Sequence, residues 1–170
     1  AFIQKMISSL FDKSEVAVFE GDATVSTFLL EQKFDHIFFT GSPAIGKVVM
    51  AAAAKYLTSV TLELGGKSPA IVGPEVNVEE AAAKIAWGKF LNNGQTCIAP
   101  DYLYLHEKNY FSFLKAIEAT VETFYGKTVS KSKDYGRIVN RRHFDRIVSL
   151  LDDAKEKGAQ VLFGGTTDAD

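Results

Sequence analysis

The sequence predicts an α/β fold with parallel strands and flanking helices, and two observations carry that prediction. Short runs of β-branched and aromatic residues alternate along the 170-residue chain with segments in which apolar residues recur every three or four positions. Gly, Asn and Pro residues separate many of these segments, as expected where a chain turns between elements. Regular alternation of this kind is typical of βαβ units, in which helices cover the faces of a parallel sheet.

The first part of the chain contains three helix patterns and three strand patterns. In the second helix pattern, Val25, Phe28 and Leu29 are expected to face inward. The strand patterns are short and rich in β-branched and aromatic residues, which favour extended backbone. The expected helices cover residues 2–11, 24–32 and 45–57, and the expected strands cover residues 16–19, 37–39 and 61–63.

The same alternation continues after Gly66. Asn77 is expected to cap a helix, with Glu80 at its third position as in a capping box, and this helix stops at Asn92-Asn93-Gly94. Asn140 is expected to open the last helix, and Gly158 follows its end. A helix between these two is expected to turn inward the residues Tyr110, Leu114, Ile117, Val121 and Phe124. The expected strands of this part cover residues 69–72, 102–105 and 160–163.

The only cysteine, Cys97, follows the polar turn at Asn92-Asn93-Gly94. Buried structural cysteines usually lie within apolar stretches, whereas backbone amides in a turn can point at a ligand. A thiol in such a turn can be a nucleophile. Composition alone favours the simpler interpretation, a free thiol on a loop.

Glu63 ends an apolar strand pattern and is followed by Leu64 and two glycines. Burial raises the pKa of a carboxyl group toward neutrality, and a carboxylate of that kind can act as a general base on water. The alternative is a solvated glutamate before a Gly-Gly turn. Taken alone, the motif favours that alternative.

A third motif runs from Ile37 to Lys47, where three apolar residues enter a Gly-Ser-Pro turn and a helix opens near Ser42. Free backbone N–H groups and the positive end of the helix dipole would face the carboxyl edge of the strand, an arrangement that can hold phosphate. The motif is neither a Walker loop nor the three-glycine dinucleotide pattern, so by itself it is weak evidence for a phosphate site.

Taken together and in this order, the three motifs resemble those of the aldehyde dehydrogenase superfamily. The segment Phe39 to Gly46 is similar to its cofactor-pyrophosphate segment, Leu62 to Lys67 to its glutamate signature, and Phe90 to Asp101 to its cysteine signature. The run Ile98 to Tyr102 is more similar to the class 3-like branch, which acts on fatty and aromatic aldehydes, than to classes 1 and 2. The resemblance extends over essentially the whole chain, including residues 134–139 and 164–165.

The resemblance implies an aldehyde dehydrogenase-like fold and an enzyme that oxidises an aldehyde to a carboxylic acid with NAD or NADP. Cys97 would be the nucleophile that forms a thiohemiacetal and then a thioester, and Glu63 would activate the water that hydrolyses it. The backbone N–H of Cys97 can stabilise the oxyanion, while the second donor in the family is an upstream asparagine absent from this sequence. The expected cofactor contacts are Gly21, Phe39, Thr40, Gly41, Ser42, Ile45, Gly46, Leu64 and Gly65.

The resemblance also implies two partial domains. Residues 1–65 would be the C-terminal part of a dinucleotide-binding domain, and residues 66–170 the N-terminal part of a catalytic domain. The chain begins inside a helix pattern and ends soon after a strand pattern, so it is expected to be an internal segment of a longer protein. We expect this segment to be inactive by itself and the full-length protein to form homo-oligomers.

Composition and sequence patterns give no support for nucleic-acid-binding, membrane-spanning or metal-binding proteins. The chain is 46% hydrophobic and 24% charged, with a formal net charge of −2, and no basic stripe suggests nucleic acid as a partner. No apolar run approaches the length of a membrane span, and no residue spacing suggests a metal site. A single cysteine forms no internal disulfide, which suits a reducing compartment such as the cytoplasm.

Two alternatives to an oxidoreductase remain. A cysteine hydrolase would need a histidine base near Cys97, but His36, His106 and His143 lie in no motif, which favours surface or packing roles for them. A non-catalytic folded fragment is the other alternative, and its unpaired sheet edges could lead to self-association.

Overall fold

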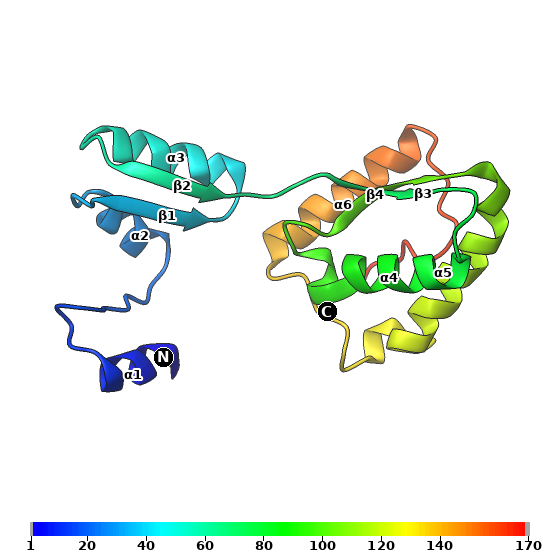
Figure 1. Cartoon of the computed structure of the whole chain (residues 1–170), viewed down its shortest axis with the longest axis horizontal. Helices are drawn as coiled ribbons and strands as arrows, with labels where there is room; N and C mark the ends of the chain where they lie inside the picture. The colour runs from blue at the N-terminus through cyan, green and yellow to red at the C-terminus, as the bar shows by residue number, and fades with distance from the viewer. Residues whose placement is uncertain (1, 169–170) are drawn as a thin grey trace. The chain divides into compact units, whose positions relative to one another are not determined.

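The computed structural model describes residues 2–168, and its backbone divides into two compact units. Unit 1 extends to Gly65 and unit 2 begins at Gly66. The division falls at the Gly-Gly step that follows Glu63 and Leu64. Both units combine helices with parallel strands, so the predicted α/β class is confirmed (Figure 1).

Unit 1 contains one pair of parallel strands and three helices. Strand β1 pairs with β2 in a register that places Phe39 opposite Leu62 and Thr40 opposite Glu63. Helix α3 packs against both strands (Figure 1). The elements are α1 (Phe2–Leu10), α2 (Ala23–Leu30), β1 (His36–Thr40), α3 (Pro43–Ala54) and β2 (Ser59–Glu63). Because parallel strands end at the same edge, the chain leaves β1 and β2 side by side.

Local signals set the helix starts of unit 1. Asp22 caps α2, its carboxylate accepting the N–H of Thr24 at 2.9 Å. Ser42 caps α3, and Pro43 occupies the first turn, where its missing N–H costs nothing. Gly46, Val49 and Ala53 form the buried face of α3.

Two predictions for unit 1 are wrong. Residues 16–19 form no strand, and Phe19 is 67% exposed. A strand requires a hydrogen-bonded neighbour, and within the described part of this unit β1 pairs with β2 alone. Phe28, expected to face inward on α2, is 62% exposed, because the short α2 is not covered on that side within the unit.

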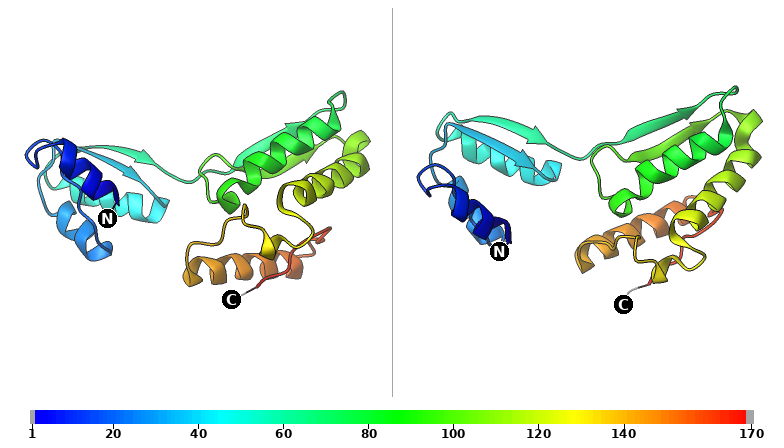
Figure 2. Two further views of the ribbon diagram at one scale, coloured as in Figure 1. Left: turned by 90° about the horizontal axis from the view of Figure 1, so that it is seen from below. Right: turned by 60° about the horizontal axis from the view of Figure 1, so that its bottom comes forward.

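Unit 2 contains a second parallel pair, β3 and β4, with α4 packed against β4 and α5 packed against α4. Ala70 lies opposite Leu103, and a register shift separates Ser68 from Pro69. Both views of Figure 2 show α6 on the side of α4 and α5 that is away from the strands. The elements are β3 (Ser68–Val72), α4 (Val78–Phe90), a 3-10 turn (Leu91–Gly94), β4 (Pro100–Leu105), a 3-10 turn (Glu107–Asn109), α5 (Tyr110–Tyr125), a 3-10 turn (Val129–Lys131) and α6 (Arg141–Glu156).

The core of unit 2 lies between these strands and α4 and α5. Its buried members are Val72, Ala82, Ala86, Phe113 and Ile117. The small side chains of α4 allow α5 to approach it closely, and Phe113 supplies most of the bulk. The expected inward face of α5 is correct at Ile117 but wrong at Tyr110 and Phe124, which are exposed near the two ends of the helix.

The caps predicted for unit 2 are confirmed. The Asn77 Oδ1 atom accepts the N–H of Glu80 at 2.9 Å, and the Asn140 Oδ1 atom accepts the N–H of His143 at 3.0 Å. In a capping box the carboxylate of Glu80 would accept the backbone N–H of Asn77. Here it accepts a hydrogen bond from Lys84 Nζ at 2.6 Å instead. Gly158 has φ +90° just after α6, as a helix stop requires.

The prediction of a strand at residues 160–163 is wrong, because these residues pair with no other strand of the described chain. Val161 and Leu162 are 45% and 53% exposed. The reason is the same as for residues 16–19: an apolar run of β-prone residues becomes a strand only where the backbone of another strand can form hydrogen bonds with it. Within the described residues, no helix is both long and apolar enough to cross a membrane.

Candidate active site

The site residues predicted in unit 1, except Gly21, lie at or near the carboxyl edge of β1 and β2. The backbone N–H of Gly41 donates to the carbonyl of Glu63 at 3.0 Å, so the turn after β1 is tied to the end of β2. Thr40 and Glu63 are register partners. Ligands of open parallel sheets commonly bind at this edge.

The start of α3 faces the same edge. Ser42 has extended backbone, and its Oγ accepts the N–H of Ile45 at 3.3 Å. Pro43 has no N–H and the N–H of Gly46 donates to the Ser42 carbonyl at 2.9 Å, so Ala44 supplies the N–H of the first turn that the helix leaves without a carbonyl partner, and the positive end of the dipole lies here. Amide and hydroxyl donors at a helix start fit a pyrophosphate group, which is the part of a dinucleotide such a turn can hold.

Gly46 closes this turn onto the strand that carries Glu63. A Cβ atom at Gly46 would lie 3.0 Å from Leu64 Cδ2 and 3.6 Å from Leu62 Cδ1, so a larger residue would push α3 away from β2. Leu64 therefore helps to set the height of α3 above the strand ends. Gly21 directly precedes Asp22, the N-cap residue of α2. The side chain of Val25 fills the space where a Cβ atom of residue 21 would lie.

Glu63 is exposed in unit 1, which agrees with the solvated glutamate that the motif taken alone favours. Helix α3 covers the strands, but the residues of this unit leave the last position of β2 open. The desolvation expected for a general base is therefore not supplied by residues 2–65. Gly65, the next glycine, has nothing within 4 Å of a Cβ built on it.

In unit 2, Cys97 follows a backbone turn of unusual conformation. Asn92, Asn93 and Gly94 have φ of 52°, 54° and 74°, all in the left-handed region. Asn and Gly tolerate this region better than other residues, which explains why they end α4 here. The turn delivers Cys97 to the surface, where it is exposed.

The side chain of Gln95 ties this turn to a distant segment, a role that sequence reasoning missed. Its Nε2 atom donates to the carbonyls of Asn92 and Arg137, both at 3.0 Å. Its Oε1 atom accepts the N–H of Val139 at 3.1 Å. The partners at 137 and 139 are separated from Gln95 by 42 and 44 residues, so no local pattern could have indicated these bonds.

Gly66 lies against the backbone of Cys97. A Cβ atom at Gly66 would lie 2.7 Å from the carbonyl oxygen of Cys97, which is closer than real Cβ atoms come to backbone oxygens. Glycine is thus required here by close packing rather than by φ. The first residue of unit 2 and the cysteine loop fit together only without a side chain at position 66.

Gly66→Ala is expected to lower the free energy of unfolding by about 1–3 kcal/mol, because one of two backbone segments must move. Chemical denaturation of the full-length protein measures this change. The matched control is Gly73→Ala, where nothing lies within 4 Å of the added Cβ. The control is expected to be neutral or to stabilise by up to about 1 kcal/mol, since alanine restricts the unfolded chain. Equal effects of both substitutions would contradict the close packing at position 66.

An ion pair lies beside the cysteine loop. Lys67 forms an ion pair with Asp101, and the hydrogen bond from its ammonium holds the pKa of Asp101 below the usual range. Lys67 therefore connects the start of unit 2 to the start of β4. On the other side of the loop, burial raises the pKa of Tyr135, whose ring contacts those of Phe90 and Tyr125.

The rings of two of the three histidines, His36 and His106, make hydrogen bonds away from Cys97. The ring of His36 contacts Ser59 Oγ at 2.7 Å and Thr61 Oγ1 at 3.1 Å, at the start of β1 rather than at its carboxyl end. The Nδ1 atom of His106 accepts the N–H of Lys108 at 3.2 Å. Both contacts support packing or capping roles.

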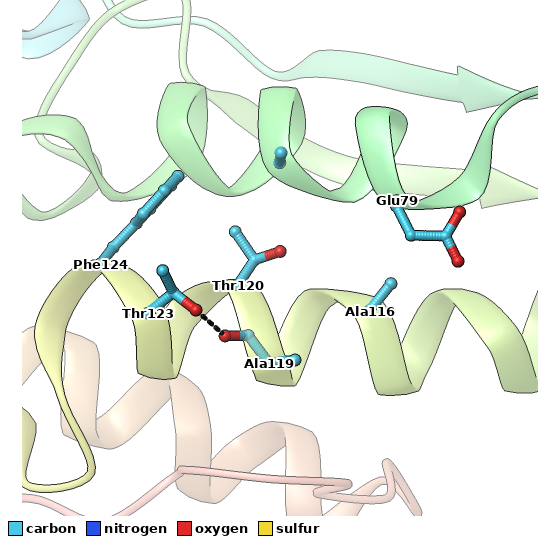
Figure 3. A pocket seen from close by; sticks show the side chains of 7 residues that line it. Glu79, Ala116, Ala119, Thr120, Thr123 and Phe124 are labelled. Atoms are coloured by element: carbon cyan, nitrogen blue, oxygen red, sulfur yellow. Dashed lines mark hydrogen bonds between the residues drawn. The ribbon is translucent and has the colours of Figure 1, made fainter.

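Unit 2 has an open groove between α4 and α5, away from the cysteine loop. Figure 3 shows Glu79 of α4 near Ala116 at one end of the groove and Phe124 of α5 at the other end, with Thr120 between them. Its floor is made of small side chains, and the Thr123 hydroxyl bonds back to Ala119 O at 2.8 Å. Its polar lining consists of the Glu79 carboxylate and the hydroxyls of Thr120 and Thr123, and none of these belongs to the cysteine loop.

The comparisons with known proteins agree with these features. The aldehyde dehydrogenase family model matches residues 5–170. The dimeric NADP-preferring aldehyde dehydrogenase of Mus musculus is 46% identical over 166 residues, which cover 98% of this chain and 36% of that protein. Aldehyde dehydrogenase family 3 member A2 of Pongo abelii is also 46% identical over 166 residues, covering 98% of this chain and 33% of that protein.

A solved structure extends the similarity to three dimensions. The substrate-bound state of Staphylococcus aureus AldH matches with a TM-score of 0.87 and 43% identity over 98% of this chain and 36% of that one. The chain thus spans about a third of the length of the curated relatives it matches. The predicted resemblance, including its class 3-like character, and the predicted fold are confirmed. The chain belongs to the aldehyde dehydrogenase family.

Proposed function

We propose that this chain carries the nucleophile and the general base of an enzyme that oxidises aldehydes to carboxylic acids with NAD or NADP. The observation that carries the proposal is the exposed thiol of Cys97 on a turn whose backbone is fixed by Gln95 and by close contact with Gly66. A nucleophile must be accessible and held in one geometry. The cysteine turn meets both requirements.

In the first step the Cys97 thiolate attacks the aldehyde carbon and forms a thiohemiacetal. The backbone N–H of Cys97 is one donor available to the developing oxyanion. When bound, NAD(P) supplies the hydride acceptor that converts this intermediate into a thioester. Glu63 then removes a proton from water, the resulting hydroxide attacks the thioester carbonyl, and the acid and the Cys97 thiol are released.

The cofactor residues are proposed at the edge of β1 and β2. Gly41, Ser42, Ile45 and Gly46 build the turn that fits a pyrophosphate, and Ser42 and the first turn of α3 supply its donors. Phe39, Thr40, Leu64 and Gly65 flank this turn, and Gly21 is the more distant contact proposed for the adenosine half. The mouse relative is named NADP-preferring, which supports NADP as well as NAD in the test.

We further propose that unit 1 is part of a dinucleotide-binding domain and unit 2 part of a catalytic domain. The division at Gly65-Gly66 supports this assignment. Each unit contributes one reacting side chain, Glu63 or Cys97, so neither unit is sufficient. Residues 1–170 alone are proposed to be inactive, and the full-length protein to be a homo-oligomer. A cytoplasmic location suits an exposed thiol that must stay reduced.

The test is to trap the acyl intermediate on the full-length protein. After mixing with a fatty or aromatic aldehyde and NAD or NADP, an acid quench is expected to leave an adduct on the peptide that contains Cys97. Its added mass should equal that of the aldehyde minus two hydrogens, because a thioester has lost both the hydride and the thiol proton. An adduct of the full aldehyde mass, or an adduct on another residue only, would contradict the mechanism. Residues 1–170 in isolation should form no adduct with the reduced mass.

The cysteine hydrolase alternative has less support. His106 is engaged at the turn before α5, and His36 bonds to hydroxyls of β2. The pH dependence of thiol alkylation distinguishes the two classes, since a histidine base would strongly depress the pKa of the thiol in the absence of cofactor. The non-catalytic alternative predicts no adduct on Cys97 even in the full-length protein.

A further inference from the structure

The turn that carries Cys97 has a backbone that requires support. Asn92, Asn93 and Gly94 are three consecutive residues in the left-handed region, which chains visit mostly as single residues. Such a conformation persists only where surrounding contacts hold it. The hydrogen bonds of the turn therefore identify what fixes the position of the thiol.

Gln95 supplies most of that support. Its main-chain N–H donates to the Asn92 carbonyl at 3.1 Å, and the side chain of Asn92 donates back to the Gln95 carbonyl at 3.1 Å. The Gln95 amide uses both of its N–H donors and its oxygen on backbone groups of Asn92, Arg137 and Val139. Only a side chain with two donors and an acceptor in one plane can make all three contacts.

The segment that receives Gln95 is itself fixed, so it can serve as an anchor. Arg137 donates through Nη1 to the carbonyl of Tyr135 at 2.9 Å and through Nη2 to that of Ser130 at 2.6 Å. A Cβ atom at Gly136 would lie 3.4 Å from atoms of Asn92 and Asn93, so this segment packs directly on the turn. The Tyr135 ring packs edge-on against Tyr125 with centroids 5.1 Å apart.

We propose that Gln95 is a positioning residue for the attack by Cys97: it locks the cysteine turn onto residues 135–139 and thereby orients the thiol and the backbone N–H that faces the oxyanion. This inference rests on the proposed role of Cys97 as the nucleophile. Gln95 acts through the loop backbone, two residues before the thiol. Loss of its amide frees the turn without removing any reacting group.

Two reactions of the thiol separate positioning from simple accessibility. Acylation by p-nitrophenyl acetate forms a bond from sulfur to the carbonyl carbon, passes through an oxyanion and expels p-nitrophenolate, so it needs the turn geometry but no cofactor. Alkylation by iodoacetamide forms a bond from sulfur to carbon with loss of iodide and has no oxyanion. A positioning role should affect the first reaction and spare the second.

In the full-length protein, Gln95→Ala is expected to slow aldehyde oxidation and the acylation burst by about a hundredfold, with the KM for the cofactor changed by less than about threefold. Alkylation of Cys97, followed by mass spectrometry of its peptide, should change by less than about threefold. The matched control is Asn109→Ala, which removes amide bonds to the carbonyls of Gly73 and Pro74 far from the turn in sequence. It should lower the melting temperature but leave acylation unchanged.

Gln95→Glu keeps the acceptor for Val139 and replaces the two donors by a carboxyl group that donates only when protonated. Its acylation rate relative to that of the wild type is therefore expected to rise as the pH is lowered, whereas the rate of Gln95→Ala relative to wild type should stay flat. This comparison remains informative if Gln95→Ala folds poorly.

Wild-type acylation rates in Gln95→Ala, or an equal loss in Asn109→Ala, would overturn the positioning role. A failure of the proposed function would be seen in different measurements. In that case the wild-type protein would show no aldehyde oxidation, while its acylation and alkylation rates would still report on the turn.

Discussion

Cys97→Ala in the full-length protein is expected to abolish aldehyde oxidation, with a loss in kcat of about 10⁴-fold or more. Removal of the thiol removes the bond that forms in the first step, and no other cysteine in this chain can replace it. Steady-state formation of NAD(P)H measures the loss. Cofactor binding, measured by fluorescence titration, should be unchanged, because the proposed pyrophosphate turn lies in unit 1.

Ser149→Ala is a suitable control for this substitution. It also removes one small polar group from an exposed position, where the hydroxyl bonds only to the carbonyl of Asp145 at 3.0 Å on α6. Its kcat should equal that of the wild type. If Cys97→Ala keeps full turnover, the assignment of the nucleophile is wrong, whatever the behaviour of Gln95 variants.

Glu63→Gln is expected to lower the steady-state rate by about 10²- to 10⁴-fold, the usual contribution of a general base. The amide has nearly the same shape as the carboxylate but cannot accept a proton from water. Only the hydrolysis of the thioester should slow, so a burst of NAD(P)H close to one equivalent per Cys97 should remain. The acyl adduct on the Cys97 peptide should then persist after the burst.

The control is Glu75→Gln, which neutralises an exposed carboxylate paired with Lys108 at 2.8 Å in unit 2. Exposed pairs of this kind contribute about 0–1 kcal/mol to stability, so neither the burst nor the steady-state rate should change. A steady-state rate equal to that of the wild type in Glu63→Gln would eliminate Glu63 as the base. Loss of the burst together with the steady-state rate would assign Glu63 to an earlier step than water activation.

Prediction from the sequence succeeds where the interactions are local. Ser42, Asn77 and Asn140 each cap a helix through an N–H three residues further along the chain, so the sequence contains both partners of the bond. The strands next to Glu63 and Cys97 are also at the expected places. The cysteine turn was recognisable because Asn and Gly favour positive φ.

Prediction fails where a residue depends on neighbours that are distant in sequence. Residues 16–19 and 160–163 have the composition of strands but no strand beside them in their own units. For Glu63 the sequence left burial and solvation as alternatives, since position in a strand says nothing about what covers its end, and the structure exposes this residue in unit 1. Exposure of Phe28 on α2 is a further case.

The sequence by itself determined the family of this protein, the order of its three motifs, and the identity of Cys97 and Glu63 as the candidate reacting groups. These follow from the resemblance of the three motifs, in this order, to those of the aldehyde dehydrogenase family. Only the tertiary structure decided that the Gln95 amide holds the cysteine turn to residues 137 and 139 and that Gly66 must lack a side chain beside the Cys97 carbonyl. The reason is that both features are contacts between parts of the chain about 30 to 45 residues apart, and packing rather than local propensity brings such parts together.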